Sequence, residues 1–219
     1  MIAPLDMTLP ELRAALGPLL PGNAAFDGWA PAALDAAALQ LGVPPERARI
    51  AFPEGAGQMI DAWFASVDDM MVAAFPPERI AAMKVRERIR ALVWSRIEAV
   101  APQREALRRA LAILALPTNL PLGTRLGWRA ADAMWRLAGD RSTDFAWYTK
   151  RLTLAGVYAS TLLALLDDDG EDLAATAAFL DRRIAGVMRF ERLKAKLKPD
   201  PDNHFSPIRF LGRLRYPPA

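Results

Sequence analysis

The stretch RSTDFAWYTKRLTLAGVYASTLLALL, residues 141–166, combines an unusual spacing of aromatic and charged residues with the longest nearly unbroken apolar run of this chain. Ser142 or Asp144 can cap a helix start, because a short side-chain oxygen accepts a hydrogen bond from a free backbone N–H of the first turn. Neither proline nor glycine interrupts the stretch before Gly156, so it predicts one helix from about Asp144 to about residue 166. Its second half is apolar on almost every side, which is typical of a helix that is buried or lines an apolar cavity.

Four residues share one face of the first two turns of this helix, at helical spacing: Asp144, Trp147, Tyr148 and Arg151. They either pack on a neighbouring helix, with Arg151 paired to an acid, or form an exposed recognition surface, because Trp, Tyr and Arg dominate interface hot spots. Composition alone favours packing. Asp132 stands between Trp128 and Trp135 at helical spacing, so it is either paired or part of an exposed patch.

The rest of the 219 residues is rich in Ala and Leu and lacks an alternating strand pattern, so we predict an all-α fold. Expected helices cover residues 9–20, 31–41, 44–52, 57–75, 78–100, 105–116, 124–138, 144–166 and 171–198. Pro21 and Gly22 are expected to end the first helix, and Pro121 and Gly123 to lie in a loop. Gly139 is expected to cap the end of the 124–138 helix. Two short helices around Gly42 give a helix-turn-helix pattern, and with the apolar body behind it this resembles the TetR architecture.

Several residue types exclude classes of function. Cysteine is absent and His204 is the one histidine, so we expect no disulfide framework, no thiolate or His-cluster metal site and no histidine-based catalytic dyad. The run Asp167-Asp168-Asp169-Gly170 lacks the alternating ligand spacing of a calcium loop, so we interpret it as a solvated turn that caps the next helix. These absences predict a binding protein without metal or cofactor, not an enzyme.

Charge is divided unevenly along the chain. Residues 1–60 hold three basic and six acidic side chains, whereas residues 188–219 hold eight basic and three acidic ones. Affinity for DNA comes largely from Lys and Arg, so the N-terminal balance disfavours DNA binding, although Arg47 and Arg49 could reach a duplex. The basic and apolar C-terminal end is a partner-docking helix, a solvated tail or a membrane-surface element.

The sequence also bears on where the protein is located. The first residues, MIAPLDMTLPELR, lack the basic and then apolar layout of a signal peptide. No apolar run reaches the roughly 18–20 residues that span a bilayer. The sequence therefore predicts a cytoplasmic protein.

Residues 127–168, GWRAADAMWRLAGDRSTDFAWYTKRLTLAGVYASTLLALLDD, closely resemble the Coq-nine family, which are lipid-binding accessory proteins of ubiquinone biosynthesis. Bacterial members are often labelled as the RpsU-divergently transcribed family. The segment Trp-x-x-Ala-Asp-x-x-Trp, followed by Gly-Asp-x-Ser-Thr-Asp-Phe-x-Trp-Tyr-Thr-Lys-Arg, is a long gapless motif. The likeness extends more weakly from about Leu9 to Met188.

This resemblance implies a TetR-like helical fold that binds isoprenoid lipid instead of DNA and presents it to the demethoxyubiquinone hydroxylase. By motif position it implies a partner-facing role, which replaces the packing interpretation, for Asp132, Asp144, Trp147, Tyr148 and Arg151. Periodicity suggests an apolar pocket lined from the helices that contain Leu111, Leu114, Trp128, Trp135, Val157 and Leu162. The expected organisation is an N-terminal lobe over 1–75, a lipid-binding lobe over 76–198 and a basic amphipathic tail over 199–219.

Family members touch membrane through a C-terminal amphipathic helix, and the basic end here is similar in kind. The residues expected to contact an anionic membrane surface are Phe190, Leu193, Lys194, Leu197, Phe210 and Leu211. Whether the 188–198 helix, the 205–216 segment or both make this contact is left open. We expect a homodimer, with the last two helices as its interface by fold analogy, peripheral on the cytoplasmic face of the inner membrane. A TetR-type transcriptional regulator that responds to a hydrophobic ligand is the alternative.

Overall fold

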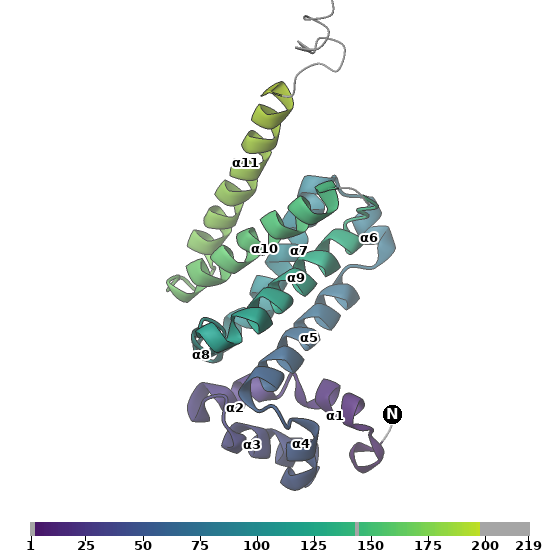
Figure 1. Ribbon diagram of the computed structural model, residues 1–219, viewed down its shortest axis with the longest axis vertical. Coiled ribbons are helices and arrows are strands. Elements are labelled where there is room, and N and C mark those ends of the chain that lie inside the picture. The colour runs from purple at the N-terminus through teal and green to yellow at the C-terminus, as the bar shows by residue number, and fades with distance from the viewer. Residues whose placement is uncertain (1–2, 143–144, 198–219) are drawn as a thin grey trace, which may run out of the picture.

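The computed structural model describes residues 3–142 and 145–197, and within those ranges every regular element is a helix. Figure 1 shows their arrangement. The α-helices are α1 (Leu9–Leu16), α2 (Leu20–Asp27), α3 (Pro31–Leu41), α4 (Pro45–Ala51), α5 (Ala56–Ala74), α6 (Pro77–Ala81), α7 (Val85–Val100), α8 (Arg104–Leu114), α9 (Leu120–Leu137), α10 (Phe145–Leu166) and α11 (Ala174–Leu197). Short 3-10 helices cover Pro4–Asp6, Ala101–Gln103 and Pro117–Asn119. The predicted all-α fold is confirmed.

Helices α1 to α4 form a small lobe around one end of the long helix α5 (Figure 1). The predicted helix pair around Gly42 is present as α3 and α4, and Gly42 has a φ of 78°, in the left-handed region that favours glycine. Trp29 joins this lobe to the body. Its indole N–H donates to the Ala106 carbonyl oxygen at 3.0 Å, and its ring stacks on Trp63 with 5.4 Å between centroids. The predicted boundary at residue 75 falls directly after α5.

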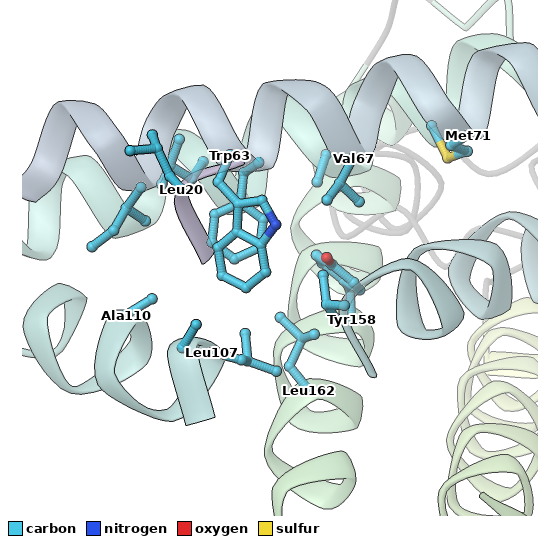
Figure 2. Close-up of a cluster of buried hydrophobic side chains, with 14 of the residues drawn as sticks. Leu20, Trp63, Val67, Met71, Leu107, Ala110, Tyr158 and Leu162 are labelled. Carbon is cyan, nitrogen blue, oxygen red and sulfur yellow. The ribbon is translucent and has the colours of Figure 1, made fainter. Parts of the chain in front are cut away.

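One part of the core lies between α5, α8 and α10, where buried side chains meet as Figure 2 shows, and the core continues through the N-terminal lobe, α7 and α9. Members labelled there are Leu20, Trp63, Val67, Met71, Leu107, Ala110, Tyr158 and Leu162. Arg96 of α7 is buried at its edge, where its guanidinium pairs with Asp68 of α5 and lies 4.8 Å from the Tyr158 ring centroid. Arg129 of α9 bonds to the other oxygen of Asp68 at 3.0 Å. Because a buried charge is costly unless it is paired, this network fixes α7 and α9 against α5.

Helix α11 packs against α10 and α7 and extends past the other helices in Figure 1. An ion pair reaches it from α7: Arg90 Nε donates to Asp181 Oδ1 at 2.6 Å. The last helix is therefore attached to the body as far as about Val187, and its last turns extend beyond the other helices.

Two prolines explain where the predicted loops were wrong. The helix predicted over 9–20 is in fact two helices, and Pro21 lies in the first turn of α2 instead of ending a helix. Pro121 likewise lies in the first turn of α9, so Pro121 and Gly123 are helical and not in a loop. Proline is suited to a first turn, because the N–H it lacks would have no intrahelical partner there.

The helix predicted over 78–100 is also wrong, because α6 ends at Ala81 and α7 begins at Val85. The backbone N–H of Lys84 donates to Glu87 Oε2 at 3.1 Å, which caps a new helix start. The last helix begins at Ala174 instead of residue 171, after Leu173, whose φ is 55°. The range 31–41 is confirmed as α3.

Candidate functional site

Helices α9 and α10 are joined by a tight turn that begins at Gly139. Gly139 has a φ of 86°, its N–H donates to the Arg136 carbonyl at 3.0 Å, and the N–H of Asp140 donates to the Trp135 carbonyl at 2.9 Å. These bonds close the end of α9, as predicted for Gly139. The turn brings Asp140 back against the first turns of α10.

Trp128 of α9 and Trp147 and Tyr148 of α10 form what we call the aromatic patch. The rings of Trp128 and Trp147 are 5.4 Å apart, and those of Trp147 and Tyr148 meet edge to face at 4.7 Å. Tyr148 is 59% exposed, and Phe145 and Leu152 on the same helix are exposed as well. A cluster of exposed large apolar side chains marks an interaction site more often than a plain solvated face. The patch is therefore a candidate docking surface.

Arg151 lies buried beneath this patch. Its side chain is 2% exposed, and its guanidinium lies 4.1 Å from the centroid of the Trp147 ring. Its Nε donates to Asp132 Oδ1 at 2.6 Å, and its Nη1 donates to Asp140 Oδ2 at 3.1 Å and to the Trp147 carbonyl at 3.2 Å. This pairing with acids is what the packing interpretation expected of Arg151. Contact of Arg151 or Asp132 with a partner stays a prediction, and Asp144 lies outside the described residues.

Asp140 holds two adjacent residues of α10 at once. Its side chain is 4% exposed, and its Oδ1 accepts from Lys150 Nζ at 2.7 Å while its Oδ2 accepts from Arg151. Burial alone would raise the pKa of this carboxyl, but hydrogen bonds from Lys150, Ser142 and Arg151 outweigh it and lower the pKa from 3.8 to about 2. The carboxylate is therefore ionised at neutral pH.

A largely apolar cleft of about 540 Å³ lies between α7, α10 and α11. Small-molecule sites typically enclose about 300–1,000 Å³, so the volume suits a ligand. Its apolar walls include Ile89, Leu154, Val157, Ile184, Val187 and Met188. Trp135, Thr149 and Lys150 also face it. Cleft and patch thus share the first turns of α10.

The six predicted pocket residues are divided by the structure. Trp135 and Val157 line the cleft, whereas Trp128 belongs to the aromatic patch. Leu114 and Leu162 are core side chains, at 7% and 4% exposure, and Leu111 packs partly buried against the core. Periodicity identified apolar faces but not which of them stays unfilled.

The predicted membrane residues fall mostly beyond what can be described. Phe190 is 64% exposed on α11 and lines a second, more open groove of about 730 Å³ between α10 and α11. Leu193, Lys194 and Leu197 belong to α11, past the residues whose side chains are described. Phe210 and Leu211 lie outside the described residues. Membrane contact stays a prediction for all six.

The two arginines that could reach DNA are engaged within the N-terminal lobe. Arg47 donates to the carbonyl oxygens of Leu5 and Met7, the latter at 2.5 Å. Arg49 pairs with Asp35 at 2.5 Å. Both arginines belong to α4, the helix that would contact a DNA duplex, and both already bind other groups of the protein.

The acidic run 167–170 forms the expected cap. Asp168 Oδ2 accepts from the N–H of Thr176 at 2.8 Å and from its hydroxyl at 2.6 Å, and Asp168 Oδ1 accepts from the N–H of Gly170. These bonds lower the pKa of Asp168, the Thr176 hydroxyl contributing most. Over residues 3–142 and 145–197, no cluster of acidic or His side chains has the geometry of a metal site. Helices in the same ranges are all too short or too polar to cross a bilayer.

Residues of the cleft that the sequence did not identify come from α7 and α11. Ile89 and Ile184 are on apolar stripes, but α7 and α11 lie far apart in sequence, and no one-dimensional pattern tells which stripes face each other. Asp140 and Lys150 did have a signal, because both stand inside the gapless motif. Their pairing across the turn became visible only in three dimensions.

Comparison with known proteins gives a consistent picture. Residues 120–191 match the COQ9 family model. The mitochondrial ubiquinone biosynthesis protein COQ9 of Rattus norvegicus is 40% identical over 115 residues, which are 52% of this chain and 37% of that protein. The Homo sapiens COQ9 protein is 37% identical over 52% of this chain and 36% of its own length. The matched region thus spans little more than a third of these relatives.

Two further similarities extend beyond that region. A probable coq9 protein of Dictyostelium discoideum is 25% identical over 173 residues, 76% of this chain and 56% of its own. A crystal structure of a TetR transcriptional regulator from Nitrosomonas europaea superposes with a TM-score of 0.65, at 23% identity, over 82% of this chain and 99% of the regulator. The TetR-like fold is thereby confirmed. At 23% sequence identity, the similarity supports the fold and not a shared function.

Proposed function

We propose that this chain, a relative of the COQ9 proteins over residues 120–191, acts in ubiquinone biosynthesis as a non-enzymatic lipid carrier. It would take an isoprenoid quinone intermediate from the membrane and present it to the demethoxyubiquinone hydroxylase. The observation that carries this proposal is the sharing of α10 by the two sites: one side of its first turns faces the apolar cleft and another bears the aromatic patch.

The cleft supports the lipid part of the proposal. Ile89, Leu154 and Ile184 offer an apolar surface from three helices, and a polyprenyl chain gains free energy by leaving water for such a surface. No cofactor is needed for this role, because binding and transfer break no covalent bond.

The patch supports the docking part. Tyr148 is exposed and rests edge to face on Trp147, so a partner meets two aromatic rings that are already ordered. Rigid aromatic anchors lose little conformational entropy on binding, which is one reason that Trp and Tyr dominate hot spots. Docking here would place the enzyme beside the cleft.

Two further features belong to the same proposal. Basic residues towards the end of α11 and beyond would hold the protein on an anionic leaflet, at about 1 kcal/mol for each cation near the surface. A homodimer through α10 and α11 is proposed from the TetR-like fold.

Mass spectrometry of the lipids that co-purify with the protein tests the proposal. We expect isoprenoid quinones or their precursors in the wild type. In Val187→Trp the indole would occupy the cleft, so this variant should co-purify without lipid. Leu163→Trp, on an exposed part of α10, should carry lipid as the wild type does. Wild-type protein that contains no such lipid after gentle purification, and takes up none from vesicles, would overturn it.

A TetR-type regulator is the second candidate, favoured by the similarity to a solved TetR regulator. It requires tight and salt-dependent binding to a defined operator. The engagement of Arg47 and Arg49 by the protein's own groups predicts that a gel-shift titration with genomic fragments will detect only weak, non-specific binding.

A further inference from the structure

The cleft differs in polarity along its length. Thr149 and Lys150 face it from the second turn of α10, whereas Leu154 and Val157 face it from further along the same helix. Seven residues of α-helix separate Lys150 from Val157, which is about 10 Å. An elongated ligand with one polar end would therefore meet different surroundings at its two ends.

An ion pair lies close in sequence to two residues that line the apolar end of the cleft. Ile89 of α7 and Ile184 of α11 both line the cleft. Next to Ile89, and one turn before Ile184, Arg90 and Asp181 bind each other at 2.6 Å. The two guanidinium bonds to this carboxylate satisfy both charges. This pair joins the two helices at the level of the two isoleucines, which give a ligand hydrocarbon surface there.

Lys150 at the other end has hydrogen-bonding capacity to spare. An ammonium group has three N–H donors. Within the described part of the chain, Lys150 Nζ uses two, to Asp140 Oδ1 at 2.7 Å and to Ser142 Oγ at 3.4 Å. The same nitrogen lies 5.5 Å from the centroid of the Trp135 ring, and the Trp135 indole N–H donates to the Lys150 carbonyl. Carboxylate, hydroxyl and ring thus hold the ammonium in place, with one donor left.

Arg86 offers the other cation of the cleft lining, but it is not held in this way. It is exposed at the first turn of α7, and over residues 3–142 and 145–190 no hydrogen bond or ion pair fixes its side chain. Ordering a long free side chain costs side-chain entropy that a pre-positioned Lys150 has already lost. Lys150 is the better placed donor.

We propose that the ammonium of Lys150 binds an oxygen of a neutral ring headgroup, a quinone carbonyl or a phenol hydroxyl, at the α10 end of the cleft, while the hydrocarbon chain lies toward Val157 and Ile184. This rests on the proposed function, which supplies the lipid, and adds the end at which its ring is held. Asp140 is the positioning residue for Lys150.

The orientation has a consequence for presentation. Lys150 directly precedes Arg151, whose guanidinium supports the Trp147 ring, and Asp140 binds both cations. The ring of the lipid would therefore lie within two helical turns of the surface on which the hydroxylase docks. The ring, which the hydroxylase must reach, would then be the end of the lipid that lies nearest to the docked enzyme.

Calorimetric titration of lipid-stripped protein tests this with two probes that share a ten-carbon tail. Decylubiquinone carries ring oxygens, and decylbenzene does not. For Lys150→Met we expect the dissociation constant of decylubiquinone to rise about tenfold, the size of one lost hydrogen bond to a charged group, with that of decylbenzene unchanged. Lys150→Arg should restore most of the difference. Arg125→Met removes an exposed cation far from the cleft and should bind both probes as the wild type does.

Each failure has a distinct meaning. Wild-type protein that binds both probes equally, or a Lys150→Met variant that loses both alike, overturns headgroup binding but leaves lipid binding standing. Wild-type protein that binds neither overturns the proposed function as well. A measurement on unaltered protein guards against misfolding of the variants: a photoreactive group on the quinone ring should label residues 145–150, and one at the tail end should label Val157 and Ile184. The reverse labelling overturns the orientation.

Discussion

The guanidinium of Arg151 lies 4.1 Å from the centre of the Trp147 ring, so a buried cation supports an aromatic side chain of the aromatic patch from below. The same guanidinium binds Asp132 and Asp140, one from α9 and one from the turn after it. The contact joins the aromatic patch to the turn that also holds Lys150. Loss of the Arg151 guanidinium should therefore disturb both the aromatic patch and the position of Lys150.

We expect Arg151→Met to lower the free energy of unfolding by about 3 kcal/mol or more, because it leaves two carboxylates without their buried partner. For a chain of this size that is a fall of roughly 6–12 °C in the melting temperature. Arg136→Met is the matched control: Arg136 also binds Asp132, at 2.8 Å, but is 73% exposed and should cost less than about 1 kcal/mol. Equal effects in calorimetry would show that burial of Arg151 contributes nothing.

Tyr148→Ala should separate docking from stability. Because Tyr148 is 59% exposed, we expect its loss to change the free energy of unfolding by no more than a surface substitution does, about 0.5 kcal/mol. Binding to purified hydroxylase should weaken about 30-fold or more, the effect of a hot-spot residue of at least 2 kcal/mol. Leu163→Ala, also exposed on α10, should leave binding unchanged. Surface plasmon resonance with all three proteins decides the matter, and unchanged affinity of Tyr148→Ala contradicts docking at the patch.

Asp140 predicts a defined pH dependence. Its pKa is lowered in the folded protein from 3.8 to about 2, so the stability it contributes is present above pH 4 and is lost as the pH falls toward 2. The shift corresponds to about 2 kcal/mol. In Asp140→Asn we expect lower stability at pH 7 and a shallower decline of the unfolding free energy between pH 4 and 2. Urea titrations at several pH values measure this, with Asp169→Asn, an exposed acid, expected to follow the wild type.

The affinity of the protein for an anionic membrane should depend more on the lysines near the end of α11 than on the presence of residues 199–219. Deleting residues 199–219 removes three Arg and two Asp, whereas changing Lys194, Lys196 and Lys198 to Glu reverses three cations. At about 1 kcal/mol for each cation near an anionic surface, the triple change should weaken vesicle binding by about a hundredfold or more, and the deletion by much less. Sedimentation with vesicles containing anionic lipid compares the two. A deletion that abolishes binding while the triple change does not would assign the contact to Phe210 and Leu211.

How far the sequence predicts this protein depends on the range of the interactions involved. Local signals were reliable: Gly42 and Gly139 adopt the left-handed conformation at the helix ends where they were expected, and α3 has the predicted bounds. The predictions at Pro21 and Pro121 were wrong, because proline is as compatible with a helix start as with a helix end. Only the packing of the residues that follow the proline distinguishes the two cases.

The site was predictable only in part for a related reason. The spacing of Trp147, Tyr148 and Arg151 places them on one face of a helix, but that face is both a packing and an exposed surface, with Arg151 beneath and Tyr148 outside. The cleft needs Ile89 from α7 and Ile184 from α11, and such a long-range pairing leaves no trace in one sequence.

The attachment of α11 also bears on when the protein becomes competent during its synthesis. Asp181 is made 91 residues after Arg90, at a pace of roughly 5–20 residues per second. Until α11 has left the ribosome, the nascent chain has Ile89, Leu154 and Val157 but no third wall to cover them. If the chain carries lipid as proposed, loading would therefore follow the synthesis of α11, and a chain interrupted before α11 would present those side chains to chaperones instead of a ligand.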